Sequence, residues 1–254
     1  MKHIPDSLWC EIEKLIPQKE TNVGRPPCDD RKAFDGIFYV LKTGCQWDML
    51  PEKYGNYKTV HGKYMRWVRA GVFEKMMVKA REYYRRKNKK NIWYAFDTVI
   101  KKAPFAEFGG KNPTDRAKNG IKNSIIVDRK GAPLFVGIAP ANKGDAKLYK
   151  PLVGKMRKSK KVRIMAGDSA FDVAELRSYS KEKNIALITS PNRRRGKDKH
   201  KFNVPYRWIV EQAIGILSWF RGIKICWAKT QESALGFIKI ACALRLFKMA
   251  GILR

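Results

Sequence analysis

Hydrophobic residues change their spacing along the chain near residue 90. Before that point they recur every three or four residues, which is the period of an amphipathic helix. In the segment 31–44, for example, Phe34, Ile37, Phe38 and Leu41 share one helical face. Prolines and glycines interrupt this pattern and divide it into several short helices. We therefore expect residues 1–88 to form a small helical domain.

After residue 90 the apolar residues form short runs of strand length, separated by turns and amphipathic segments. Runs of this kind, predicted as strands, lie at 91–100, 121–127, 133–139, 162–166 and 185–189. Helices are expected after the third, fourth and fifth runs. This order is that of an α/β domain with a ribonuclease-H-like layout, in which flanking helices cover a five-stranded mixed sheet. We expect this domain to occupy residues 89–254.

Three acidic residues lie within apolar segments of the second domain. Asp97 falls in the first predicted strand, Asp168 directly after the fourth, and Glu211 in the helix that follows the fifth. An ionised carboxylate among apolar neighbours is costly unless a cation meets it. In the expected layout these three positions converge, so one pair of metal ions could meet all three. Each acid also has a structural explanation: a strand edge, a helix start, and an ion pair between Glu211 and Arg207.

Three other acids are better explained by local structure. Asp128 lies in the turn VDRKGAP between the second and third strands. Asp145 is expected to cap a helix. Asp172 stands three residues before Glu175, which is the spacing of a capping box, so it is expected to begin the next helix.

Charge adds a partner to this picture. The 254 residues include 54 Lys+Arg against 23 Asp+Glu, a formal net charge of +31. Such an excess along the whole chain is expected of a surface that binds nucleic acid. The runs 155–163 and 193–201 are the predicted phosphate contacts. Basic outer faces on short helices favour a DNA-binding role for residues 1–88, although a helical domain with a solvated basic face fits the same pattern.

Cysteine and histidine usage excludes several other classes of protein. The five cysteines are scattered without a CxxC pair, which argues against a disulfide framework and a zinc ribbon. No apolar run reaches the length of a membrane span, so we expect a cytoplasmic protein without membrane contact.

Trp208 and Trp219 could stack on a displaced base. As helix residues beside Val210 and Phe220, they are expected in the core instead.

Carboxylates and a polyphosphate partner together indicate phosphodiester chemistry. Two Mg²⁺ ions about 3.5–4 Å apart can activate the attacking oxygen and neutralise developing charge. Mg²⁺ prefers carboxylate oxygens, with Mn²⁺ as a possible substitute, so such a site needs no histidine or cysteine. Asp97 would bridge both ions, Asp168 would hold one and Glu211 the other. Arg207 could orient Glu211 or bind a phosphate.

Several stretches of the chain resemble a known family. They are LIPQKETNVGRPPCDDRKAFDGIFYVLKTGCQWDMLP (15–51), FDTVIKKAPFAEFGGKNPTDRAKNGIKNSIIVDRKGAPLFVGIAPANKGDAKL (96–148), GDSAFD (167–172), YRWIVEQAIGILSWFRGIKICWAK (206–229) and FIKIACALRLF (237–247). The chain resembles the DDE transposases of bacterial and archaeal insertion sequences, in the branch named for insertion sequence five.

The resemblance implies a specific activity. Asp97, Asp168 and Glu211 match the family's first, second and third acids. The implied reaction is hydrolysis at terminal inverted repeats of double-stranded DNA, followed by attack of the freed 3′-hydroxyl on target DNA. Because two ends must be held together, a homodimer or larger assembly is expected.

Two positions depart from the family's pattern. Ser169 stands where a lysine usually follows the second acid. Ser218 stands seven residues after Glu211, where many relatives carry a lysine that contacts the transposon end. Arg221 or Lys224 is a candidate substitute for that lysine. The residues expected to contact DNA are Arg207, Lys118, Lys122, Arg193, Arg194, Arg195, Arg221 and Lys224.

Two other functions remain open at this point. A metal-dependent nuclease of the same fold would cut DNA without joining it, although a leader domain suited to specific ends argues against this. A DNA-binding descendant would have lost catalysis, although the intact set of acids argues against that. Metal-dependent joining separates the transposase from the nuclease, and metal-dependent cutting separates both from the descendant.

Overall fold

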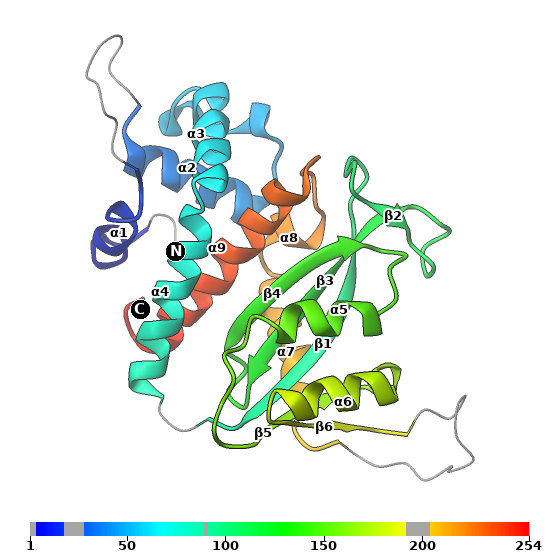
Figure 1. The fold of residues 1–254 in the computed structure, drawn as a ribbon. Coiled ribbons are helices and arrows are strands. Elements are labelled where there is room, and N and C mark those ends of the chain that lie inside the picture. Colours follow the sequence, from blue (N-terminus) through cyan, green and yellow to red (C-terminus); the bar gives the residue numbers. More distant parts are fainter. Residues whose placement is uncertain (1–3, 18–27, 89–90, 192–203, 254) are drawn as a thin grey trace. The chain divides into compact units, whose positions relative to one another are not determined.

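The computed structural model describes residues 4–17, 28–88, 91–191 and 204–253 (Figure 1). The chain forms two compact units. The first unit combines Met1–Lys87, Ala103–Glu107 and Leu217–Arg254, and the second combines Asn88–Lys102 and Phe108–Ile216. This division differs from the expected one at the C-terminal end, because the last segment groups with the N-terminal helices.

The second unit is built on a mixed sheet. Its strands are β1 (Trp93–Lys102), β2 (Gly110–Lys111), β3 (Asn119–Asp128), β4 (Pro133–Pro140), β5 (Arg163–Gly167) and β6 (Ile185–Thr189). The strand order is β2-β3-β1-β5-β6, and β4 also pairs with β3. The β1–β3 and β3–β4 pairs are antiparallel, whereas β1–β5 and β5–β6 are parallel. This confirms the ribonuclease-H-like α/β layout, to which the structure adds the two-residue strand β2.

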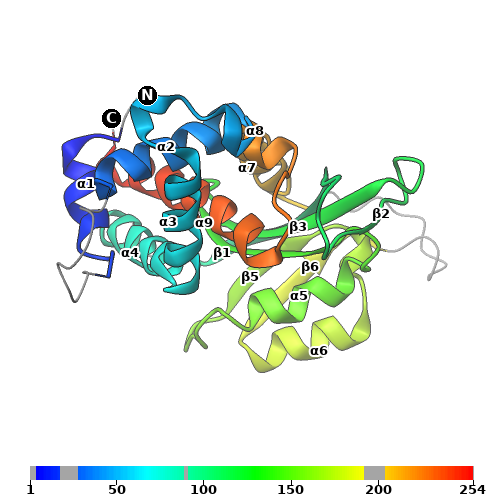
Figure 2. The same ribbon diagram turned by 90° about the horizontal axis from the view of Figure 1, so that it is seen from above.

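Helices cover both faces of this sheet. Figures 1 and 2 show α5 (Ala146–Val153) and α6 (Ala174–Glu182) on one face. Helix α7 (Trp208–Leu217) lies on the opposite face. The alternation of β1 explains this arrangement, since successive side chains along a strand point to opposite faces. Phe96 therefore packs under α5 against Tyr149, while Asp97 faces the other way.

The loop acids behave differently from one another. Asp128 is a turn residue as predicted, and its Oδ1 accepts the amides of Lys130 and Ala132. Asp145 occupies the N-cap position of α5 but makes no capping hydrogen bond, because its carboxylate is bonded to other side chains. The capping box at Asp172 is wrong. Helix α6 begins at Ala174 without a side-chain cap, and the Asp172 carboxylate accepts hydrogen bonds from Arg177.

The first unit is helical. Its main helices are α1 (Asp6–Glu13), α2 (Asp30–Thr43), α3 (Tyr57–Arg69), α4 (Val72–Lys87), α8 (Arg221–Lys224) and α9 (Gln231–Ala250). Two short 3₁₀ helices, Trp47–Met49 and Glu52–Tyr54, lie between α2 and α3. Asp29 caps α2 by accepting the Lys32 amide, and Gly44 ends it with a φ of 69° that glycine adopts without strain.

Helix α9 is the centre of this unit. Most of its apolar residues are buried, and it packs along α4. Burial on more than one face exceeds what an amphipathic surface helix requires, so α9 is a core helix. No helix in the described ranges is long and apolar enough to cross a membrane.

Candidate active site

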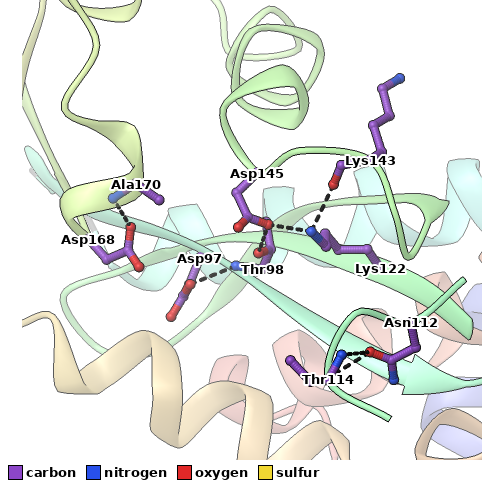
Figure 3. A network of polar contacts seen from close by, with 9 residues as sticks. All are labelled: Asp97, Thr98, Asn112, Thr114, Lys122, Lys143, Asp145, Asp168 and Ala170. Carbon is purple, nitrogen blue, oxygen red and sulfur yellow. Dashed lines mark hydrogen bonds and ion pairs between the residues drawn. The ribbon is translucent and has the colours of Figure 1, made fainter. Parts of the chain in front are cut away.

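The first predicted acid lies on β1, and the second directly follows its parallel neighbour β5. Ala95 of β1 pairs in register with Ala166 of β5. Asp97 and Asp168 each follow two residues later, Asp97 within β1 and Asp168 at the first position after β5. Figure 3 shows the two carboxylates as neighbours. The structure therefore brings together two acids that are 71 positions apart in the sequence (168 − 97).

A backbone amide orients each of these carboxylates. The Thr98 amide donates a hydrogen bond of 2.8 Å to Oδ1 of Asp97. The Ala170 amide donates one of 2.7 Å to Oδ1 of Asp168. Asp168 thereby caps the 3₁₀ turn Ser169–Phe171, which explains why the chain turns directly after β5. Among the described residues, the second oxygen of each carboxylate has no hydrogen bond that would compete with a ligand.

Buried aromatic rings anchor the backbone beside both acids. Phe96 directly precedes Asp97, and Phe171 lies three residues after Asp168. The two rings meet edge to face, with centroids 4.8 Å apart and an interplanar angle of 89°. Tyr149 of α5 packs against both rings. This cluster fixes the distance between the two strands at the point where the acids emerge.

Glu211 enters the site from α7. The start of this helix is anchored by Tyr206, whose hydroxyl accepts a 2.7 Å hydrogen bond from Arg129 and whose ring packs edge-on against Trp93. Glu211 lies in the first turn, and Arg207 donates a hydrogen bond of 2.7 Å to its Oε1. The structure thus contains the Arg207–Glu211 ion pair that the helical spacing predicted.

The charges of the other two acids change the pKa of Asp97. Burial, together with the charges of Asp168 and Glu211, raises the pKa of Asp97 to about 6. The Thr98 amide and the Arg207 guanidinium act in the opposite direction. Asp168, Glu211 and Arg207 therefore each lie within electrostatic range of Asp97.

The residues present fit divalent metal ions in their chemistry. Carboxylate oxygens are the ligands that Mg²⁺ prefers. A buried carboxyl whose pKa is raised by burial and like charges is also the kind of group that a cation stabilises. Within the described ranges, no three His, Cys, Asp or Glu side chains converge closely enough to hold an ion. The Glu211 carboxylate is instead paired with the Arg207 guanidinium.

A polar network behind the site escaped the sequence interpretation. The Thr98 hydroxyl donates a hydrogen bond of 2.7 Å to Oδ1 of Asp145 (Figure 3). Lys122 lies 2.8 Å from the same oxygen and also donates to the Lys143 carbonyl. Lys122 is the only charged residue in the predicted strand 121–127, and this was the available signal, since a cation within a buried strand needs a partner.

Two predicted DNA contacts on the sheet differ in exposure. Lys118 is exposed. Lys122 is only 6% exposed, and its ammonium is already paired with Asp145, so the structure does not offer it to a phosphate. In the run 155–163, Arg163 is likewise buried and donates to the Lys183 carbonyl. The strand alternation explains both cases, because each cation lies on a covered face.

The remaining predicted contacts lie elsewhere. Arg221 and Lys224 are exposed on α8 of the first unit. The run 193–201, with Arg193, Arg194 and Arg195, lies outside the described residues.

The expectation for the two tryptophans is wrong. Trp208 is 59% exposed and Trp219 is 85% exposed, so neither packs in the core. Trp208 lies at the first position of α7, and Trp219 lies between α7 and α8, where the chain leaves the helix. A run of apolar residues in a sequence does not show where a helix begins and ends. Residues at its ends can therefore be exposed although their neighbours in sequence are buried.

The sheet order and the acids on β1 and after β5 define a ribonuclease-H-like domain with an acidic site. Residues 97–246 match the model of the family described as "Transposase DDE domain", and the chain belongs to this family. Residues 4–77 match a second model, "Putative transposase of IS4/5 family".

Two curated relatives are proteins of one insertion element. The chain is 28% identical over 144 residues to a "Putative transposase for insertion sequence element IS402" of Burkholderia cepacia, covering 53% of this chain and 66% of that protein. It is 39% identical over 79 residues to an "Insertion element IS402 uncharacterized 16.2 kDa protein" of the same organism, covering 29% of this chain and 54% of that one. The chain thus spans less than two thirds of the length of these relatives.

Solved structures give weaker likenesses. A piggyBac transposase synaptic complex with hairpin DNA aligns at 11% identity with a TM-score of 0.44, covering 96% of this chain and 71% of that one. A Mos1 mariner paired-end complex with Mn aligns at 10% identity with a TM-score of 0.28, covering 97% and 87%. Similarity at this level carries no functional argument for this chain.

Proposed function

We propose that this protein is a DNA transposase that cleaves at the terminal inverted repeats of its insertion sequence and joins the 3′-hydroxyl ends to target DNA. The observation that carries the proposal is the placement of Asp97 on β1 and of Asp168 directly after β5, the parallel strand that pairs with β1. Membership of the transposase DDE family and a net charge of +31 support the same reaction on the same substrate.

In this proposal Asp97, Asp168 and Glu211 are the catalytic acids and would hold two Mg²⁺ ions, with Mn²⁺ as an alternative. Bound there, the ions activate the attacking oxygen and neutralise charge on the phosphate. The amides of Thr98 and Ala170 keep the first two carboxylates in place for this task. Arg207 orients Glu211 through a hydrogen bond, and its guanidinium is the group of this site that would bind a phosphate oxygen.

In this proposal each of the two units contributes residues that contact DNA. Helices α1 to α4 would bind the transposon ends, and the exposed Lys118, Arg221 and Lys224 would contact phosphates. The residues Arg193, Arg194 and Arg195 would add to this surface. Because two ends must be held together during joining, the protein would act on double-stranded DNA as a homodimer or larger assembly, in the cytoplasm at the nucleoid.

The test is a cleavage-and-joining assay on DNA that carries the inverted repeats flanking this gene, with Mg²⁺ or Mn²⁺. Asp97→Asn and Glu211→Gln should abolish both nicking at the repeat ends and joined products. Glu182→Gln, the same loss of charge on an exposed residue of α6, is the matched control and should retain both activities. Cutting without joining would indicate a nuclease, and binding without cutting in the wild-type protein would indicate a DNA-binding descendant.

A further inference from the structure

The loop between β2 and β3 holds two residues in a conformation that their side chains disfavour. Arg116 has a φ of 49° and Ala117 a φ of 56°. This left-handed region suits glycine, and residues with a Cβ rarely adopt it twice in succession. Strain of this kind persists only where the surrounding structure imposes it, and it is concentrated at functional sites.

The imposing structure is centred on Asn112, which is only 6% exposed. Its side-chain Oδ1 accepts hydrogen bonds from the amide and the hydroxyl of Thr114, at 3.0 and 2.9 Å (Figure 3). Its own amide donates to the Lys118 carbonyl, and its carbonyl accepts the Ala117 amide. Asn112 thus closes the loop at both ends and fixes its backbone.

Close packing at the base of the loop adds to this rigidity. Gly110 pairs with Gly120 across β2 and β3. A Cβ on Gly110 would lie 2.4 Å from Oδ1 of Asn142, so any larger residue would require the Asn142 side chain to move. On the other side, Asp115 lies 3.4 Å from the ammonium of Lys102 at the end of β1. The loop is therefore tied to the end of the strand that carries Asp97.

This rigid loop presents positive charge to solvent. Lys111, Arg116 and Lys118 are all exposed. Within the described ranges none of the three takes part in an ion pair, and the one acid of the loop is paired with Lys102. A solvated basic turn needs no strain, and glycine at 116 and 117 would remove it. Cations carried on a fixed backbone instead suit a partner with regularly spaced anions, such as the phosphates of a duplex.

We propose that the loop 112–118 is a preformed clamp for the DNA backbone, with Arg116 and Lys118 as its phosphate contacts. The proposal rests on the proposed transposase function. From Asp97 to Lys102 the strand advances five residues, or about 17 Å at the rise of a β-strand. A duplex cleaved at Asp97 and running along β1 would present to the loop the phosphates about five base pairs from the cut.

The experiment measures DNA binding by the full chain, with Asp97→Asn in every protein so that the DNA stays uncut. The variants Arg116→Gln and Lys118→Gln each remove one exposed cation from the loop. Lys181→Gln removes one from α6, on the other face of the sheet, and is the matched control. Affinity for the inverted-repeat DNA is measured over a range of salt, and phosphate-ethylation interference maps the contacted phosphates.

Each loop variant is expected to reduce the slope of log K against log salt by about 0.9, the value for one lost phosphate contact. Each should also abolish interference about five base pairs from the cleavage site, while Lys181→Gln changes neither result. Unchanged slope and interference in the loop variants would overturn the clamp, and so would an equal loss in Lys181→Gln. If the otherwise unmodified protein cuts these ends in either case, the transposase proposal stands. A protein that neither binds nor cuts the repeats overturns both.

Discussion

The guanidinium of Arg207 donates a hydrogen bond of 2.7 Å to Oε1 of Glu211, one turn further along α7. The third acid of the site is therefore paired with a cation from its own helix, whereas the first two acids are oriented only by backbone amides. Both side chains of the pair remain partly exposed, at 37% and 52%. An exposed pair contributes little to stability, so its position beside Asp97 points to a role in the reaction.

Replacing Arg207 should separate activity from stability. We expect Arg207→Gln to change the free energy of unfolding by less than about 1 kcal/mol, because the pair is exposed. Cleavage should nevertheless fall by about 10- to 100-fold, the range seen when a partner of a metal ligand is removed. Single-turnover cleavage and urea unfolding measure the two effects. Full activity in the variant would mean that the pair is only a surface contact.

The ring contact between Phe96 and Phe171 predicts a second variant whose loss of activity is separate from its loss of stability. Phe171→Leu removes the edge-to-face contact and should cost about 1–2 kcal/mol of stability. Because Phe171 anchors the turn after Asp168, cleavage should fall at least tenfold even where the variant is fully folded. Phe73→Leu, in the buried core of the first unit, is the matched control for a lost ring. Equal loss of activity in both variants would show that the effect is one of general stability.

Removing the negative charge of Asp97 should stabilise the folded protein. Burial raises the folded-state pKa of Asp97 to about 6, against a reference value of 3.8, so the folded protein binds this proton more tightly than the unfolded chain. Wild-type stability should therefore increase as pH falls from 7 through 6 towards 4. At pH 7.5 we expect Asp97→Asn to be more stable by about 1–2 kcal/mol. Its amide oxygen can still accept the Thr98 hydrogen bond.

Denaturant unfolding in the presence of a chelator, at pH 7.5 and pH 5, measures this difference. The gap between variant and wild type should shrink at the lower pH. Added Mg²⁺ should then stabilise the wild type and leave Asp97→Asn unchanged, because a ligand stabilises only the state that binds it. If the Asp97→Asn variant were less stable than the wild type at pH 7.5, this would contradict the raised pKa of the Asp97 carboxyl.

Local patterns in the sequence were enough to locate the two central acids. The period of apolar residues identified β1 and β5, and the order of elements placed these strands side by side, so Asp97 and Asp168 could be expected to meet. Long-range packing was less accessible. The apolar pattern of α9 predicts a buried helix but does not say that α4 is its neighbour.

Side-chain pairing was the least predictable feature. Asp145 precedes a helix, and its position suggested a cap, yet its carboxylate is bonded to Thr98 and Lys122. The reason is that a buried ammonium requires a partner more strongly than a helix end does, since the helix end can be satisfied by water. That partner lies 23 positions away in the sequence (145 − 122), and no local pattern reveals it.

The Lys122–Asp145 pair predicts a stability effect without a DNA-binding effect. Lys122→Gln leaves a carboxylate without its cation and should cost about 2–3 kcal/mol of unfolding free energy, less than for a fully buried pair because Asp145 is partly exposed. The salt dependence of DNA binding should not change, since the ammonium is buried. Lys118→Gln, an exposed lysine four residues earlier in the chain, should show the opposite result on both measurements. A reduced salt slope for Lys122→Gln would restore this residue as a phosphate contact.

The left-handed backbone of the 112–118 loop can be tested through stability alone. Ala117→Gly removes the Cβ that disfavours a φ of 56°, which should relieve about 1–2 kcal/mol in the folded state. The greater freedom of glycine in the unfolded chain returns about 0.5–1 kcal/mol of this gain. We therefore expect a net stabilisation of up to about 1.5 kcal/mol, measured as a higher midpoint of urea unfolding with an unchanged slope. Ala146→Gly, in the first turn of α5, is the matched control and should be destabilised by about 0.5–1 kcal/mol. Equal destabilisation of both variants would show that Ala117 is not strained, and the argument for a preformed clamp would lose its basis.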